Sequence, residues 1–190
     1  HPNLRSYAPN LRYYTEHNVK GMFCEASAFA ELAELRAWLL AKLMWNPNAE
    51  ANHLIETFTN GYYGPAGPHI VDYIQLTHNA VEATDDFLGL GSRPDAKFLS
   101  LETLTRGWNH LQVAAAAVAN DPVLARRVQI TRLPIMFVFL HRWNELREAA
   151  KDAGVRWPMA ASQQQLHADI VALARVHGIR LKDVPSPIPF

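Results

Sequence analysis

The feature that most constrains the fold of this chain is one strand-like run in a sequence otherwise patterned for helices. Residues 19–23 read VKGMF and stop at Cys24 and Glu25, and this mixture of β-branched, aromatic and turn residues is typical of a short strand. A strand without a neighbour is not stable in water. We therefore expect its partners to lie in residues outside this chain. Alternatively, the partner lies on a second chain, or residues 19–23 form a small irregular pairing. A further alternative is that residues 19–23 are an extended connection that packs on helices.

Apolar residues recur every three or four positions along most of the remaining chain, as helices require. Helices are predicted over about residues 7–16, 30–45, 47–61, 68–88, 100–119, 121–152 and 162–178. Asn46, Asp121 and Ser162 are the expected N-caps, and Pro134 is expected to kink the longest helix. The predicted fold class is mainly α, a bundle of about five to six helices preceded by one short β-strand.

Composition excludes several classes of function. The 190 residues carry 18 basic and 18 acidic side chains, and this balance argues against a nucleic acid or an anionic membrane as partner. Cys24 is the only cysteine, so an internal disulfide and a cysteine zinc cluster are excluded, and a buried thiol is expected. The nine histidines match no metal-site spacing, so we expect neither a metal nor a cofactor.

Three stretches together resemble a known family: PNLRYYTEHNVKGMF, LRAWLLAKLMWNPNA and FTNGYYGPAGPHI. They resemble the C-terminal portion of an uncharacterised glycoside-hydrolase-like family related to α-glucuronidases and β-hexosaminidases, over roughly residues 3–80. In that family a (β/α)8 barrel precedes a helical domain. The resemblance implies that residues 1–29 end a barrel that is otherwise missing, with residues 19–23 as its last strand. It also implies linking helices over 30–64 and a C-terminal helical bundle over 65–190.

The same resemblance implies a role for Glu25. In the hexosaminidase-like barrels, an acidic residue after the last strand binds sugar hydroxyls, so Glu25 is expected to bind substrate rather than to donate a proton. The alternative is that Glu25 has no role in binding and is an acid at the start of the following helix, where the helix dipole stabilises its charge. The family also implies a carbohydrate substrate and a secreted or periplasmic location.

Glycosidases need two carboxyl groups beside the scissile bond, and no second acid follows a predicted strand. Glu31, Glu34 and the other acids fall on helices or loops and are expected to be solvated. The catalytic residues therefore stay unknown, and this chain alone is not expected to hydrolyse a glycoside. The competing hypothesis is a non-catalytic helical module that binds a partner protein in an exposed groove. The identity of the segment that pairs with residues 19–23 distinguishes the enzyme hypothesis from the helical module.

Overall fold

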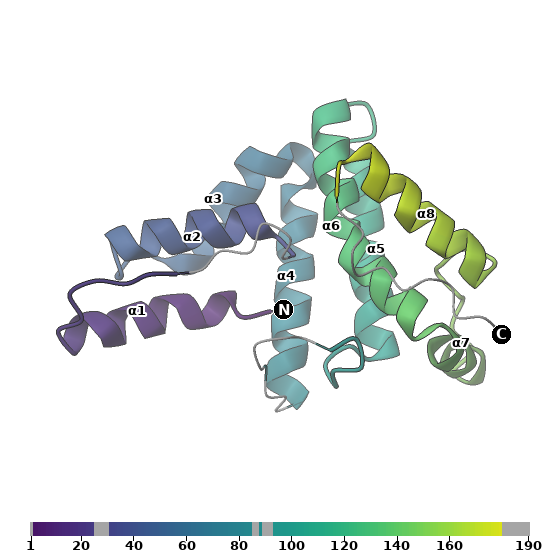
Figure 1. The fold of residues 1–190 in the computed structure, drawn as a ribbon, viewed down its shortest axis with the longest axis horizontal. Helices are drawn as coiled ribbons and strands as arrows, with labels where there is room; N and C mark the ends of the chain where they lie inside the picture. The colour runs from purple at the N-terminus through teal and green to yellow at the C-terminus, as the bar shows by residue number, and fades with distance from the viewer. Residues whose placement is uncertain (1, 25–30, 85–87, 89–92, 180–190) are drawn as a thin grey trace.

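The computed structural model describes residues 2–24, 31–84, 88 and 93–179 (Figure 1). These ranges are mainly helical and contain no strand. The α-helices are α1 (Tyr7–Glu16), α2 (Ala33–Trp45), α3 (Ala51–Tyr63), α4 (Gly67–Thr84), α5 (Leu101–Ala117), α6 (Pro122–His141), α7 (Trp143–Asp152) and α8 (Gln163–Val176). Short 3-10 turns at Leu4–Ser6 and Gly64–Ala66 precede α1 and α4.

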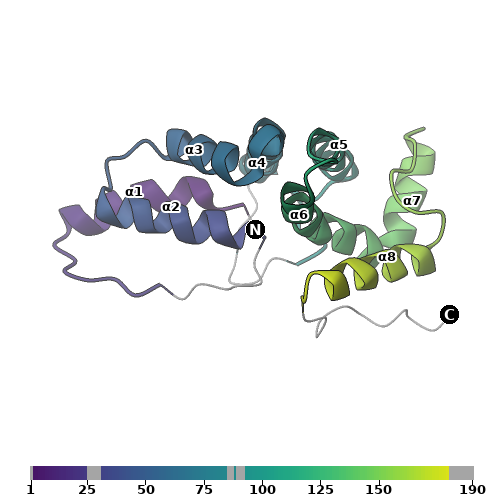
Figure 2. The same cartoon turned by 90° about the horizontal axis from the view of Figure 1, so that it is seen from above.

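The long helix α4 lies at the middle of the molecule. Helix α3 packs on one side of it and α5 on the other; α6 packs on α5, and α8 packs on α6. Helices α1 to α3 extend to one side of α4, and α7 and α8 lie at the opposite end of the molecule (Figures 1 and 2). The mainly helical class that the sequence predicts is confirmed.

One continuous apolar core joins these helices. In α2 the leucines at 35, 39 and 43 are fully buried, as their spacing of four predicts. Ile70 of α4, Leu111 of α5 and Phe139 of α6 are also fully buried and belong to the same core. Burying a side chain of this size stabilises the folded state by roughly 1.5–3 kcal/mol.

Two of the three predicted N-caps are confirmed. The Asp121 carboxylate accepts hydrogen bonds from the amides of Val123 at 2.9 Å and Leu124 at 3.0 Å, and the Ser162 hydroxyl accepts one from Gln165 at 3.1 Å. Each cap satisfies amides that the first helical turn leaves unpaired.

The third predicted cap is wrong, because Asn46 closes a turn instead of starting a helix. Its side-chain oxygen accepts from the Asn48 amide at 3.1 Å, and its carbonyl accepts from the Ala49 amide at 3.1 Å. This local pairing competes with helix formation. Helix α3 accordingly begins at Ala51 rather than at Pro47.

The longest predicted helix is interrupted at Arg142, and α6 runs through Pro134. Arg142 has non-helical backbone angles, with φ −105° and ψ 29°. Its guanidinium donates to the Leu99 carbonyl at 2.6 Å and to Glu145 at 2.5 and 3.0 Å. The tertiary contact with Leu99 fixes a break that local sequence does not encode.

The strand predicted over residues 19–23 is not present. The Val19 amide donates to the Tyr14 carbonyl at 3.0 Å, which closes the end of α1, and Asn18 reverses the chain with a left-handed φ of 59°. Between described residues, the backbone of 20–23 forms no hydrogen bond to another backbone group. A ladder needs a second extended segment beside the first, and the described ranges supply none.

Helices α1 and α2 lie side by side and run in the same direction (Figure 1). Near their first turns, the Arg36 guanidinium of α2 donates to the Asn3 side chain and reaches the Tyr7 hydroxyl at 3.5 Å. Further along, Arg12 of α1 donates to the Pro47 carbonyl just after α2, at 3.4 Å. The segment after α1 therefore has to return along the helices before α2 can begin.

Candidate functional site

A cavity of about 320 Å³ lies between α4, α5, α6 and the connection that precedes α5. Its lining is mostly apolar, with a few polar groups from α4, α5 and the residue before α2. Its lining includes Glu31, Tyr73, Thr77, Arg93, Phe98, Leu104, Ile135 and Val138. Apolar walls with a few convergent polar groups are typical of small-molecule sites.

The polar end of the cavity is a carboxylate–phenol pair. The Tyr73 hydroxyl donates to Oε1 of Glu31 at 2.5 Å. Burial first, and then the charge and hydrogen bond of Glu31, raise the pKa of Tyr73 well above its ordinary value. The Tyr73 phenol therefore keeps its proton at neutral pH and its hydrogen stays directed at Glu31.

Glu31 is held from its backbone side as well. The Arg36 guanidinium donates from Nε to the Glu31 carbonyl at 2.6 Å, and its charge acts on the Glu31 carboxylate. The acid that the sequence places on a solvated helix face is thus half-buried and bound to Tyr73 of α4. Its partner Tyr73 lies 42 positions away in the sequence, so no local pattern could have found it.

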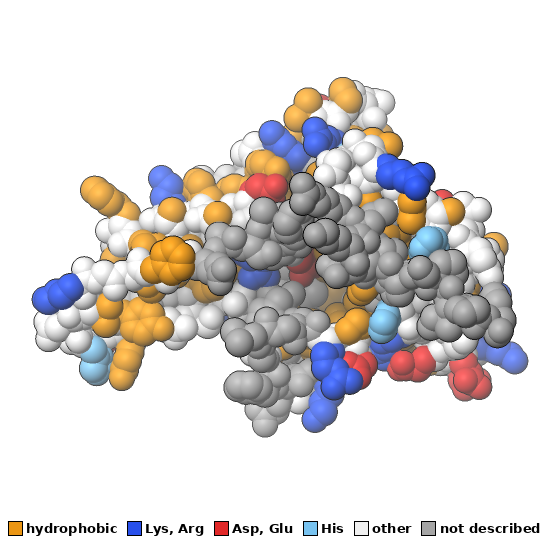
Figure 3. Space-filling view, viewed as in Figure 1, with side chains coloured by type: hydrophobic (Ala, Val, Ile, Leu, Met, Phe, Trp, Pro, Cys, Tyr) orange, Lys and Arg blue, Asp and Glu red, His pale blue; other side chains and the backbone are white. Residues whose placement is uncertain are grey.

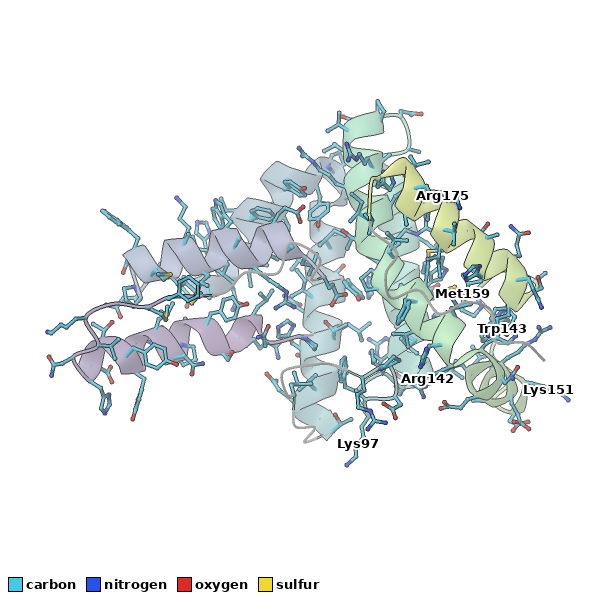
Figure 4. All side chains as sticks on the ribbon, viewed as in Figure 1. Lys97, Arg142, Trp143, Lys151, Met159 and Arg175 are labelled. Atoms are coloured by element: carbon cyan, nitrogen blue, oxygen red, sulfur yellow. The ribbon has the colours of Figure 1, made fainter. Side chains whose placement is uncertain are left out.

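Arg142 fixes the wall that carries Phe98. Its guanidinium donates to the carbonyls of Pro94, at 3.4 Å, and Leu99, at 2.6 Å, and is paired with Glu145 on the other side. Figure 4 shows Arg142 at the foot of α6, close to the connection that carries Lys97. Glu145 thus binds Arg142, while His141 next to it stacks on Phe137.

A buried histidine attaches the amino-terminal segment to α4. Nε2 of His78 accepts from the Leu4 amide at 2.9 Å, and Nδ1 faces the Ile74 carbonyl at 2.7 Å. One acceptor and one donor define the neutral ring. Burial lowers the pKa of His78 to about 4, and the charges of Arg5 and Arg36 act in the same direction.

A second feature is the apolar surface at the far end of α1 and α2. The exposed side chains there come from α1, the segment that follows it and the end of α2: Tyr13, Tyr14, Val19, Phe23, Met44 and Trp45. Phe23 is 90% exposed and Trp45 is 92% exposed. Figure 3 shows hydrophobic side chains gathered at this end of the molecule. Large contiguous apolar patches on a protein surface mark contact sites.

The other residues singled out from the sequence have mixed outcomes. Glu25 lies outside the described residues, so its role stays a prediction. Cys24 is exposed, and the expectation of a buried thiol is wrong. Trp108 belongs to the core and lies beneath the Arg132 guanidinium, which is 4.4 Å from its ring centre. Within the described ranges, no group of three metal-ligating side chains comes together.

Comparison with known proteins finds one match. A family described as a domain of unknown function, DUF4838, matches residues 1–75, which is less than half of the 190 residues. No curated protein and no solved structure matches the chain. The match covers much the same region as the resemblance to a barrel terminus.

None of the helices in the described part of the chain is long and apolar enough to cross a membrane.

Proposed function

We propose that this chain is the C-terminal part of a carbohydrate-active, glycoside-hydrolase-like enzyme. In this proposal α1, residues 17–24 and α2 are the end of a (β/α)8 barrel, and α4 to α8 form a helical domain that supports the barrel. The resemblance over residues 3–80 supports the enzyme class. The DUF4838 match over residues 1–75 falls on the same region and carries no activity of its own.

The observation that carries the proposal is the parallel arrangement of α1 and α2. Helices joined by a short loop run antiparallel in bundles. Consecutive helices of a barrel run parallel instead, because a strand returns the chain between them. The contacts of Arg36 with Asn3 and of Arg12 with Pro47 establish the parallel direction here. The stretch of seven residues from 18 to 24 can span about 23 Å when extended, and α2 is about 20 Å long.

The side chains of this returning segment fit a strand that lacks its sheet. Met22 packs against the core beneath it, whereas Val19 and Phe23 are exposed. In a barrel, one face of each strand packs on the helices and the other points inward. Neighbouring strands would also pair with the backbone of residues 20–23.

Glu25 follows this segment, at the end where barrel enzymes place their binding groups. We propose that its carboxylate accepts hydrogen bonds from sugar hydroxyls. The acid and the nucleophile or base would come from other barrel strands. A secreted or periplasmic location belongs to the same proposal and rests on the resemblance alone.

The test uses a longer polypeptide in which the natural upstream sequence precedes residue 1. We expect it to hydrolyse at least one 4-nitrophenyl glycoside from a panel of neutral, amino and acidic sugars, and the chain of 190 residues to hydrolyse none. Glu25→Gln should lower kcat/KM by roughly 10- to 100-fold at unchanged thermal stability, since charged hydrogen bonds to a sugar contribute about 1.5–3 kcal/mol. Glu102→Gln, which breaks an exposed pair with Arg106, is the matched control.

A longer polypeptide that is folded and hydrolyses no member of the panel would overturn the proposal. A Glu25→Gln variant with the kinetics of the parent would discard Glu25 as the sugar-binding residue. A monomeric longer chain with no barrel, seen as a far-UV spectrum without strand content, would favour the helical interaction module instead.

A further inference from the structure

We propose that the cavity between α4, α5 and α6 binds a compact, uncharged apolar group that carries a hydroxyl, and that this group is the leaving-group side of the glycoside substrate. The binding of such a group follows from the cavity itself. Its assignment to the substrate rests on the proposed function.

The walls select an apolar body of roughly aromatic size. Phe98 and Leu104 are almost fully buried, and Ile135 and Val138 of α6 face the same space. The volume of about 320 Å³ is at the low end of the range of about 300–1,000 Å³ usual for small-molecule sites. One ring with a short substituent fits such a space.

The polar groups select a ligand that donates a hydrogen bond. The Tyr73 hydrogen is committed to Glu31 at 2.5 Å. The Thr77 hydroxyl donates to the α4 backbone, at 3.1 Å from the Tyr73 carbonyl and 3.0 Å from the Ile74 carbonyl. Each oxygen keeps lone pairs and therefore acts toward the cavity as an acceptor. A hydroxyl satisfies such acceptors and an ether or a carbonyl does not.

The charges at the cavity favour a neutral ligand. Arg93 is held by Asp95 through two hydrogen bonds, at 3.0 and 2.8 Å. The Glu31 carboxylate has the Arg36 guanidinium close by. The charges of Arg93 and Glu31 are thus each compensated by a protein group of opposite sign. A ligand with a carboxylate, phosphate or ammonium group would find no uncompensated charge to pair with in the cavity.

The position of the cavity connects it with catalysis. Glu31 lies just before α2, on the side of the molecule where α1 and α2 begin (Figure 1). In a barrel the helices begin at the face where the strands end, and the active site is built on that face. The first turns of α1 and α2 are tied together there by Arg36. The helical domain would therefore contribute a wall of the active site in addition to supporting the barrel.

The first experiment measures binding to the chain of 190 residues with phenol as the probe and toluene as its counterpart without a hydroxyl. Chemical shifts of the protein methyl groups should show saturable phenol binding in the millimolar range, and toluene binding at least 5-fold weaker. Val138→Phe, which fills the cavity, should weaken phenol binding at least 10-fold. Val123→Phe, a matched substitution at an exposed position of the same helix, should leave it unchanged.

Phenol that does not bind saturably, or that binds Val138→Phe as well as the parent, overturns the binding site. Thr77→Val provides an independent check: it removes one of the two acceptors and leaves the Tyr73–Glu31 pair in place, so the preference for phenol over toluene should narrow, and an unchanged preference would contradict the role of the acceptors. Circular dichroism on each variant establishes that the helices are intact before its binding is compared.

The second experiment tests the assignment to the substrate, in the longer polypeptide. Val138→Phe should lower kcat/KM for the 4-hydroxyphenyl glycoside at least 10-fold and change that for the methyl glycoside less than 2-fold. Equal losses for both substrates overturn the assignment. If no glycoside is hydrolysed at all, the proposed function and the assignment both fall, while phenol binding still decides whether the cavity is a site.

Discussion

At the scale of single residues, His78 makes the stability of this protein depend on pH. Burial lowers its pKa to about 4, whereas a histidine in the unfolded chain has a pKa near 6.5. Between these values the unfolded chain binds more protons than the folded one, so stability falls as pH falls below about 6.5 and is fully present above it. The folded state therefore favours the neutral His78 imidazole, which accepts a hydrogen bond from the Leu4 amide.

We expect the free energy of unfolding to decrease by about 1–2 kcal/mol between pH 7 and pH 5 through His78 alone. Urea unfolding at the two pH values measures the decrease. His78→Gln, which loses the titrating group, should be less stable at pH 7 and should show a smaller decrease than the parent. An equal decrease in both proteins would assign the pH dependence to other groups.

The partner of His78 also shows where single-residue prediction ends. The sequence presents the histidines as scattered and without metal spacing, and it contains no local sign that Leu4 lies against residue 78. Glu31 and Tyr73 present the same difficulty, since their pairing depends on how α2 meets α4. Capping residues could be predicted because a cap and its helix are neighbours in the chain, as Asp121 and Ser162 show.

At the scale of helices, the corner between α3 and α4 depends on Gly67. A methyl group built on Gly67 would lie 2.8 Å from the Thr59 carbonyl oxygen and 2.7 Å from the Asn60 side-chain oxygen. The Thr59 carbonyl belongs to the backbone of α3 and cannot rotate away. The close approach of the two helices therefore requires glycine.

Gly67→Ala should destabilise the protein by roughly 1–3 kcal/mol, because the extra carbon forces α3 and α4 apart. Gly61→Ala is the matched control, since a methyl group at 61 meets nothing within 4 Å. In the interior of α3 it should stabilise by roughly 0.5–1 kcal/mol through helix propensity. Thermal unfolding of the three proteins gives the order, and a Gly67→Ala variant at least as stable as the parent would contradict the account of the corner.

Most helices could be predicted from the sequence because apolar spacing and caps act locally. The prediction over 7–16 matches α1 and that over 100–119 closely matches α5. It failed at Asn46, where a turn uses the same side chain that a helix would use as a cap, and at Arg142, where a contact with Leu99 ends the helix. Both failures have a competing hydrogen bond as their cause.

At the scale of the whole molecule, the strand prediction was the most informative error. The composition of residues 19–23 favours a strand, yet a strand exists only beside another. The chain instead leaves Phe23 exposed, and the segment connects two parallel helices along the sequence. Local composition therefore does not by itself decide whether a segment forms a strand, because a strand also needs a second extended segment beside it.

The exposed Phe23 ring gives a prediction that tests the proposed barrel. In the chain of 190 residues, Phe23→Ser removes no buried surface and should change the free energy of unfolding by less than about 0.5 kcal/mol. If the proposed barrel precedes this chain, it buries the same ring in the longer polypeptide, and the loss of the ring should cost roughly 1.5–3 kcal/mol. Differential scanning calorimetry of both proteins compares the two losses. Val176→Ser, at a side chain 77% exposed on α8, is the control and should be neutral in both. A Phe23→Ser variant that is neutral in the longer polypeptide as well would mean that the barrel does not cover this face.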